Sequence, residues 1–354
     1  MKIITGAALL TLASLAALPA QGAEPTYTLT DLGVAPDGVW PIGGVLKIGI
    51  NDHGDVAASR AIAGFPIRPG GEAFLYRHGH ITLVNPALHN PIAVGPGPSY
   101  GTAVNNKGIA VGFNANVPSD EPSVPFLFNA KGQITQLPVL LNSGRPFAIN
   151  ENGYVTGFAG GFRGNRQIQV FLYDGHTIRG IGPVSPFAGL NAGFGLNEHN
   201  EVVGVISGHA FYYNGISIAD LGTLGGNESE AMAINTYSEI VGGADTADGK
   251  QHAFLFADGH MYDLGPGQAN AINDDRWVVG ETDTPVAFLW DGAVHDLNGM
   301  IAANDPLHGN VHLTTAQAIN NRGEIVAEDC STVSTTSTCE IFILTPTEEK
   351  IARR

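Results

Sequence analysis

Short apolar runs, separated by turn residues, recur along most of the chain. Each run spans about five residues, which is the usual length of a β-strand and too short for a typical helix. Many runs are followed by Asp-Gly or Asn-Gly, and these pairs supply the positive φ angles that tight hairpin turns require. Such pairs stand at 174–175, 214–215, 258–259 and 291–292. The pattern therefore predicts an all-β fold built from hairpins.

One motif returns seven times: Ala or Gly, an aliphatic residue and then Asn, followed by a turn and a second apolar run. Its asparagines are Asn51, Asn105, Asn150, Asn197, Asn235, Asn273 and Asn320. They stand 54, 45, 47, 38, 38 and 47 positions apart. Asparagine is a good turn former, so we expect these residues to shape the turn that follows them. A repeat of this length is typical of propeller blades with four short strands each.

An aromatic run forms the second half of each copy. These runs are Ala73–Tyr76, Pro125–Phe128, Val170–Tyr173, His209–Tyr213, His252–Phe256, Val286–Trp290 and Glu340–Leu344. A short segment that ends in Asp-Leu closes several copies, so each copy predicts four strands. The small residues of the first strand suit a crowded rim near a central axis, and the aromatic residues of the third suit the packing between blades. We expect His209 and His252 to form hydrogen bonds within their own blades.

The two ends of the repeat region complement each other. The seventh copy stops at Thr345-Pro346 and lacks its fourth strand, whereas Tyr27–Gly33 has the pattern of a fourth strand with no other strands before it. The N-terminal strand is therefore expected to complete the last blade and to remove an exposed sheet edge. We predict an all-β, seven-bladed β-propeller in one domain, residues 24–346. A flat β-solenoid is the alternative, and it would not need the exchanged ends.

The first 23 residues have the organisation of an export signal. Lys2 precedes an apolar run from Ile3 to Ala20, and small residues follow at Gly22 and Ala23. An uncleaved anchor helix is the alternative, because the apolar run is about long enough to span a bilayer. We predict a signal peptide over 1–23, a mature chain that is secreted or periplasmic with no membrane span, and a charged tail over 347–354.

The two cysteines of the chain, Cys330 and Cys339, are nine positions apart. In an oxidising compartment such a pair closes a local disulfide over the Ser/Thr-rich residues between them. The sequence therefore predicts a Cys330–Cys339 disulfide.

These residues resemble the extracellular HAF repeat family of bacteria, which is named for the tripeptide that stands here at His209–Phe211 and His252–Phe254. The linker Asp220–Gly226 is also similar to that family's pattern. The first two copies depart from it, with Glu72 and Pro125 where the histidine would stand. The resemblance implies a secreted bacterial repeat protein and implies no reaction.

Composition narrows the choice of partners. The chain has 33 Asp and Glu against 17 Lys and Arg, a net charge of −16. Nucleic acid is excluded as the main partner, because binding to phosphates needs a basic surface. Charged residues make up only 14% of the chain, so it is not a disordered acidic polymer. Its 47 glycines recur at the turns and strand ends of the repeats.

The predicted strand order places the longest insertions on one face of the ring. They fall at 61–72, 86–100, 114–123, 158–168, 184–192, 244–251, 301–315 and 331–338. Long loops gathered on one face mark a candidate binding face. The candidate ligand-binding residues on it are Arg68, Phe162, Arg163, Arg166, Asp245, His308 and His312. Arg163 and Arg166 could form a fork for an anionic group such as a uronate, although solvated loop charges explain them equally well.

Signals for catalysis and for metal binding are weak. Ser99 stands in a Gly-x-Ser-x-Gly sequence, yet no helix follows it, so we interpret the segment as a turn and not as a nucleophile elbow. His308 and His312 flank Gly309 in a segment without helical character, which does not give metal-ligand geometry. We predict no cofactor and no metal site, with calcium as the ion that an acidic exported propeller would favour.

Three function classes remain. The leading one is a non-catalytic binding or interaction module, monomeric, whose ligand is a glycan or a cell-surface component. The second is an extracellular polysaccharide lyase or glycosidase, which needs paired carboxylates or a His, Tyr and Arg set near the axis. The third is a structural or adhesive surface protein.

Overall fold

The computed structural model describes residues 25–35, 47–62, 70–84, 98–114, 123–160, 167–186, 191–330 and 339–347. Within these ranges the chain is all-β, as predicted, with one 3-10 turn, η2 (Leu297–Met300), and no α-helix. The segment predicted as a signal peptide, 1–23, and residues 348–354 of the predicted tail lie outside the described residues.

We number the repeats 1 to 7 by their asparagines, from Asn51 to Asn320. Repeat 1 contains β2 (Gly49–Ile50), β3 (Val56–Ile62), β4 (Gly70–Arg77) and β5 (His80–Val84). Repeat 2 contains β6 (Ser99–Val104), β7 (Ile109–Asn114), β8 (Val124–Asn129) and β9 (Ile134–Gln136). Repeat 3 contains β10 (Gly144–Ile149), β11 (Val155–Gly160), β12 (Gln167–Tyr173) and β13 (Ile178–Pro186). Repeat 4 contains β14 (Ala192–Leu196), β15 (Val202–Ile206), β16 (His209–Tyr213) and β17 (Ile218–Asp220). Repeats 5 and 6 contain β18 (Gly225–Ile234), β19 (Ile240–Thr246), β20 (Gln251–Ala257), β21 (His260–Ile272), β22 (Val278–Thr282), β23 (Ala287–Trp290) and β24 (Val294–Asp296). Repeat 7 contains β25 (Thr315–Ile319), β26 (Ile325–Asp329) and β27 (Cys339–Pro346), and β1 (Tyr27–Ala35) precedes them all in the chain.

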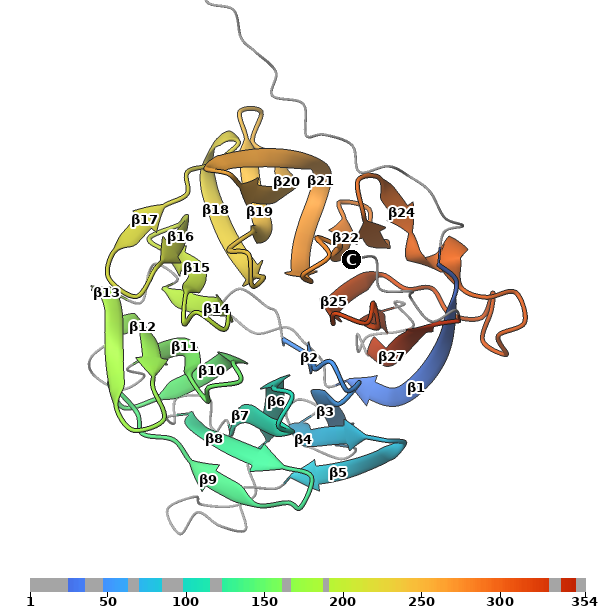
Figure 1. Ribbon diagram of the computed structural model, residues 1–354, viewed down its shortest axis with the longest axis horizontal. Coiled ribbons are helices and arrows are strands. Elements are labelled where there is room, and N and C mark those ends of the chain that lie inside the picture. Colours follow the sequence, from blue (N-terminus) through green and yellow to red (C-terminus); the bar gives the residue numbers. More distant parts are fainter. Residues whose placement is uncertain are drawn as a thin grey trace, which may run out of the picture.

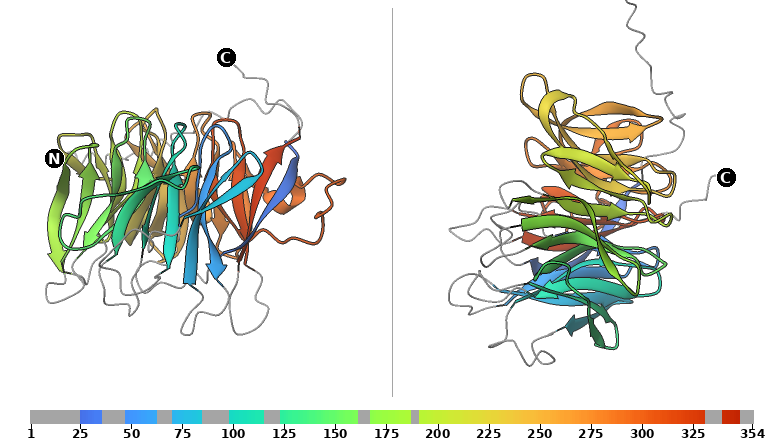
Figure 2. Two further views of the ribbon diagram at one scale, coloured as in Figure 1. Left: turned by 90° about the horizontal axis from the view of Figure 1, so that it is seen from below. Right: turned by 90° about the vertical axis from the view of Figure 1, so that its left-hand side faces the viewer.

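Each repeat forms an antiparallel sheet whose strands pair in chain order. Repeats 5 and 6 share one sheet, because the first part of β21 pairs with β20 and its last part pairs with β22. The sheets stand around a common axis with the first strand of each repeat innermost (Figure 1). The side views in Figure 2 show the strands running between two flat faces. The four-strand repeat predicted from the sequence is therefore observed.

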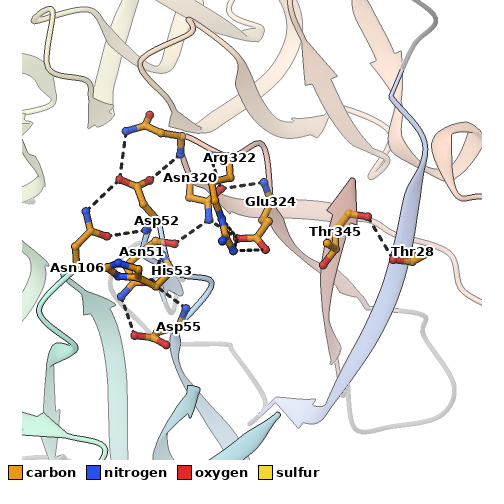
Figure 3. Close-up of polar contacts among 11 residues, drawn as sticks. Thr28, Asn51, Asp52, His53, Asp55, Asn106, Asn320, Arg322, Glu324 and Thr345 are labelled. Carbon is orange, nitrogen blue, oxygen red and sulfur yellow. Dashed lines mark hydrogen bonds and ion pairs between the residues drawn. The ribbon is translucent and has the colours of Figure 1, made fainter. Parts of the chain in front are cut away.

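The two ends of the described chain meet in one sheet. Strand β1 pairs antiparallel with β27, from Tyr27 opposite Pro346 to Ala35 opposite Cys339. Thr28 Oγ1 also donates a hydrogen bond to the Thr345 carbonyl at 3.4 Å (Figure 3). The outer edge of β27 is thus covered by a strand from the opposite end of the sequence.

The repeat asparagines link each repeat to the next. The side-chain Nδ2 of every one donates to the backbone carbonyl of the next asparagine, over 2.8–3.2 Å. The series returns to its start, because Asn320 donates to Asn51 at 2.8 Å (Figure 3). All seven side chains are buried, with 1–4% exposed. Seven buried hydrogen bonds between neighbouring repeats therefore run around the axis.

The same asparagines also shape the turn within each repeat. Asn150 Oδ1 accepts hydrogen bonds from the backbone N–H groups of Asn152 and Tyr154, at 3.0 and 2.9 Å. The residue three positions after each asparagine has a positive φ; it is Gly in four repeats and Asn200, Ser238 or Arg276 in the others. The prediction that these asparagines form turns is confirmed.

Aromatic residues of the third strands fill the space between sheets. Phe74, Phe126, Phe171, Phe211, Phe254, Phe288 and Phe342 are all 0–3% exposed. Each lies opposite Gly or Ala on the second strand, as Phe211 does opposite Gly204. A Cβ atom at Gly204 would come within 1.9 Å of the Ala192 carbonyl, so only glycine fits there. Burial of each ring stabilises the fold by roughly 1.5–3 kcal/mol.

Two further predictions are confirmed. The histidines of the His-Ala-Phe segments bond within their own repeats: His209 Nδ1 lies 2.8 Å from Asp220 Oδ2, and His252 Nδ1 lies 2.9 Å from the Asp263 carboxylate. Cys330 and Cys339 form a disulfide that joins the neighbouring strands β26 and β27.

Replacement of one ring asparagine should weaken the whole fold. The substitution Asn150→Ala removes a donor to the Asn197 carbonyl and leaves buried backbone groups without partners, so we expect a loss of about 1–3 kcal/mol in the free energy of unfolding. Urea unfolding measures it. Asn214→Ala is the matched control, because Asn214 makes the same kind of turn bonds, to Ile216 and Ser217, but is exposed. Equal losses in the two variants would contradict a special role for the buried links.

Candidate functional site

Of the seven candidate residues singled out from the sequence, the structure describes three. Arg68, Phe162, Arg163 and Arg166 lie outside the described residues. Asp245 lies on β19 opposite Gln251. His308 Nδ1 lies 3.1 Å from the Ile301 carbonyl, and the backbone N–H of His312 donates to Asp329. In the part of the chain that is described, no hydrogen bond or ion pair joins Asp245, His308 and His312 to one another.

Ser99 has a structural role. It begins β6 and is 3% exposed. Its hydroxyl donates to the Val84 carbonyl and accepts from the Ala73 N–H, both at 3.0 Å. These bonds join repeats 1 and 2, so the hydroxyl is held within the core and not on a catalytic elbow.

The innermost strands carry a bulge at one shared position. In repeats 2 to 7 the residue three positions before the asparagine is extra relative to the second strand. These residues are Thr102, Phe147, Phe194, Met232, Asn270 and Gln317. A bulge removes its residue from the regular ladder and redirects side chain and carbonyl. The rings of Phe147 and Phe194 lie 5.4 Å apart, so the bulges of repeats 3 and 4 meet beside the axis.

Lys47 joins the bulges of two distant repeats. It precedes β2 in repeat 1, yet its Nζ donates to the carbonyls of Phe194 and Met232, at 2.8 and 2.6 Å. Those residues belong to repeats 4 and 5, so the side chain crosses the axis of the ring. Desolvation lowers the pKa of Lys47 to about 7, and the charge of Glu230 acts in the opposite direction.

Acidic and amide side chains lie near the axis in repeats 5 to 7. Gln268 Nε2 donates to Glu230 at 3.2 Å, and Glu281 lies opposite Gln268 on the neighbouring strand. In repeat 7, Gln317 Nε2 donates to Glu328 at 2.9 Å. Burial raises the pKa of Glu328 to about 7, and the nearby charge of Glu281 adds to the increase. Desolvation also raises the pKa of Glu230 and of Glu281.

Repeats 2 and 3 supply a cation among aromatic rings. The Arg145 guanidinium lies 5.0 Å from the ring centre of Phe113 and 5.6 Å from that of Phe158, and its Nε donates to Ser123 Oγ. Stacking of this kind stabilises a partly desolvated guanidinium. Burial lowers the pKa of Arg145 to about 10 and raises that of its neighbour Tyr100 to about 12.

These groups lie at one end of the ring. Each of these residues stands four or five positions before a repeat asparagine, on or just before the first strand, or eight positions after one, on the second strand. The turns that the asparagines form lie at the other end of these strands. The end that holds these side chains is the face on which the sequence places the long insertions. We call this set the axial cluster: Lys47, Tyr100, Arg145, Glu230, Gln268, Glu281 and Glu328. It is cationic and aromatic on the side of repeats 2 and 3 and acidic on the side of repeats 5 to 7.

Sequence reasoning missed the axial cluster because it looked for function in loops. The signal was nevertheless present in the strands. Positions five before and eight after the asparagine hold small or apolar residues in several repeats, such as Ala192 and Val205 in repeat 4. The same positions hold Glu230, Glu281 and Glu328 elsewhere. Aligning the seven copies would have shown these polar exceptions.

Among the described residues no group of three or more His, Cys, Asp or Glu side chains is arranged to hold a metal ion. Within the same ranges no helix has the length and apolar character needed to cross a bilayer.

No protein-family model matches the chain, and no curated protein matches it. Its structure is similar to an acylaminoacyl peptidase from Pyrococcus horikoshii, with 12% identity and a TM-score of 0.52 over 93% of this chain and 53% of the peptidase. It is also similar to the β-propeller domain of the Trilobed protease from Pyrococcus furiosus (12% identity, TM-score 0.51, 92% and 97% of the two chains). A third similar structure is YCF48 bound to D1 peptide (11% identity, TM-score 0.50, 95% and 100%).

At these identities the likeness concerns the fold alone, and the chain is a β-propeller. It spans about half the length of the acylaminoacyl peptidase that it matches. What the chain binds has to be argued from its own residues.

The buried carboxyl of Glu328 should make stability fall as the pH rises. Its pKa is about 7 in the folded chain against 4.5 as the ordinary value, so the folded state keeps a proton that the unfolded state has lost. The stabilising contribution of this protonated carboxyl is complete below about pH 4.5 and is lost as the pH rises toward 7. The loss in the free energy of unfolding is at most about 3 kcal/mol.

Urea unfolding at pH 5 and pH 8 measures this effect. Glu328→Gln keeps a neutral side chain at both pH values, so its stability should change less between them than that of the unsubstituted chain. Glu340→Gln, at an exposed position of β27, is the control and should follow the unsubstituted chain. An identical pH response in the Glu328 variant and the control would show that the carboxyl is already charged at neutral pH.

Proposed function

We propose that this chain is an exported, non-catalytic binding module whose ligand occupies the axial cluster. One observation carries the proposal: ionisable side chains from six repeats lie at one end of the axis, with their pKa values moved by desolvation. Buried charges reduce stability unless they are compensated, so a ring that served only as a spacer would gain nothing from them. Perturbed ionisable groups gathered in one place are typical of functional sites.

The proposed ligand is a glycan or another cell-surface component. Carboxylates and side-chain amides on the side of repeats 5 to 7 suit sugar hydroxyls, and Arg145 on the opposite side suits a carboxylate such as that of a uronate. The export pattern at 1–23, the disulfide and the likeness of the repeats to the extracellular HAF family all support an extracellular role.

A polysaccharide array with the purified mature chain tests this function. We expect retention on at least one acidic or neutral glycan, and at least tenfold weaker retention for Glu281→Gln because this substitution removes a charge from the axial cluster. Tyr237→Ala is the matched control, since Tyr237 is 70% exposed next to an asparagine turn at the opposite end of the ring. No retention on any glycan, or equal loss in both variants, would reject the proposal.

Polysaccharide cleavage is a second candidate function, favoured by one observation. Glu328 has a pKa of about 7 and lies near a second carboxyl, Glu281, which is the pairing that acid–base cleavage of glycosidic bonds uses. The same array reports it through released products. Product that disappears in Glu328→Gln while retention remains would make the chain an enzyme; retention without product would leave binding alone.

We also propose that the propeller has seven blades and that β1 closes the ring. Support comes from the seven asparagine links that return to Asn51 and from the pairing of β1 with β27. A chain that lacks residues 24–33 should lose several kilocalories per mole of stability, because β27 would expose its edge and the core around Tyr27 would open. Thermal unfolding measures the change, and an unaltered melting temperature would refute closure by β1.

A further inference from the structure

Lys47 differs from a solvated surface lysine in its burial and in the contacts of its Nζ. Its side chain is half-buried, and its Nζ lies 5.8 Å from the ring centre of Phe194. The only hydrogen-bond partners described for this Nζ are the two bulge carbonyls, those of Phe194 and Met232. Long lysine side chains usually keep the charged head in water. This one instead delivers its nitrogen to the bulges of repeats 4 and 5.

The two carbonyls can accept both hydrogens of an uncharged amine. A neutral amine has two N–H bonds and one lone pair, whereas an ammonium has three N–H bonds and no lone pair. With the Phe194 and Met232 carbonyls occupied by the two N–H bonds, the lone pair is left without a hydrogen. A pKa of about 7 keeps about half of the molecules in this form at neutral pH.

We propose that Lys47 is a nucleophilic amine that captures a ligand bearing an aldehyde, as an imine. The lone pair of Nζ attacks the carbonyl carbon and a C–N bond forms. The carbonyl oxygen receives the two protons that leave the nitrogen and departs as water, so the amine and the aldehyde give an imine and one water without any oxidant or reductant.

The ligand class follows from this chemistry. The open-chain form of a reducing sugar carries an aldehyde together with the hydroxyls that the axial carboxyls and amides suit. The inference rests on the proposed function in one respect, namely that ligands reach the axial cluster. It goes beyond that function because it turns reversible binding into covalent capture of a reducing end.

Reductive labelling of the full mature chain tests the assignment. The chain is treated with glycolaldehyde and cyanoborohydride at pH 7, and the labelled lysines are identified by peptide mass spectrometry. We expect Lys47 to be labelled at least fivefold faster than the exposed Lys107, Lys131 and Lys250. Labelling of Lys47 after these three would overturn the proposal, because it would show a buried and protonated amine. In the Lys47→Arg variant the fast labelling should disappear, because the amine is gone. The labelling rates of the three exposed lysines should stay unchanged.

A second variant tests the role of the acidic neighbour. The charge of Glu230 favours the protonated form of Lys47. Glu230→Gln should therefore raise the labelling rate of Lys47 at pH 6 severalfold, whereas Glu340→Gln should not change it. An equal rate in both variants would count against a coupled pair.

The failures of the two proposals are distinguishable. Fast labelling of Lys47 with no retention on any glycan would support the amine and reject the glycan-binding function. Slow labelling together with retention that depends on Glu281 would support binding and reject covalent capture.

Discussion

A ring of amide hydrogen bonds organises this protein. Each repeat asparagine uses its oxygen to hold the turn of its own repeat and its nitrogen to hold the backbone of the next. Because the side chains are buried, none of these bonds competes with water, and each lost partner would leave a buried polar group unsatisfied. The hydrogen bond from Asn320 to the Asn51 carbonyl links the last repeat to the first in the same way (Figure 3).

This constraint makes the two ends of the axis differ in which residues they can hold. At the asparagine end the asparagine itself recurs in all seven repeats, because it holds both a turn and a link, whereas the residues that follow it vary. At the other end the strands need only to pack, and single repeats can replace a small residue by Glu, Gln, Arg or Tyr. The fold thereby concentrates its chemical variety at the end that also carries the long insertions, which is where we place ligand binding.

Part of this arrangement follows from the sequence because it is periodic. Seven copies with asparagine at a fixed position specify strand order, turns and the inner place of the first strand, and complementary ends predict the pairing of Tyr27–Gly33 with the last copy. The axial cluster escaped the same reasoning, since Lys47, Arg145 and Glu328 are far apart in the chain and each alone resembles a solvated charge. Their burial, and the pKa shifts that burial causes, arise only when the repeats stand around one axis.

The sequence by itself determined an all-β chain, its repeat, its disulfide and the partners of its strands, because these depend on local period and on spacing along the chain. Tertiary structure decided which polar residues meet. Lys47 reaches Phe194 and Met232 only because ring geometry places repeats 4 and 5 across the axis from repeat 1. Contacts across an axis have no period in the sequence. An alignment of the repeats can therefore mark the polar exceptions, but only the folded chain shows which of them meet.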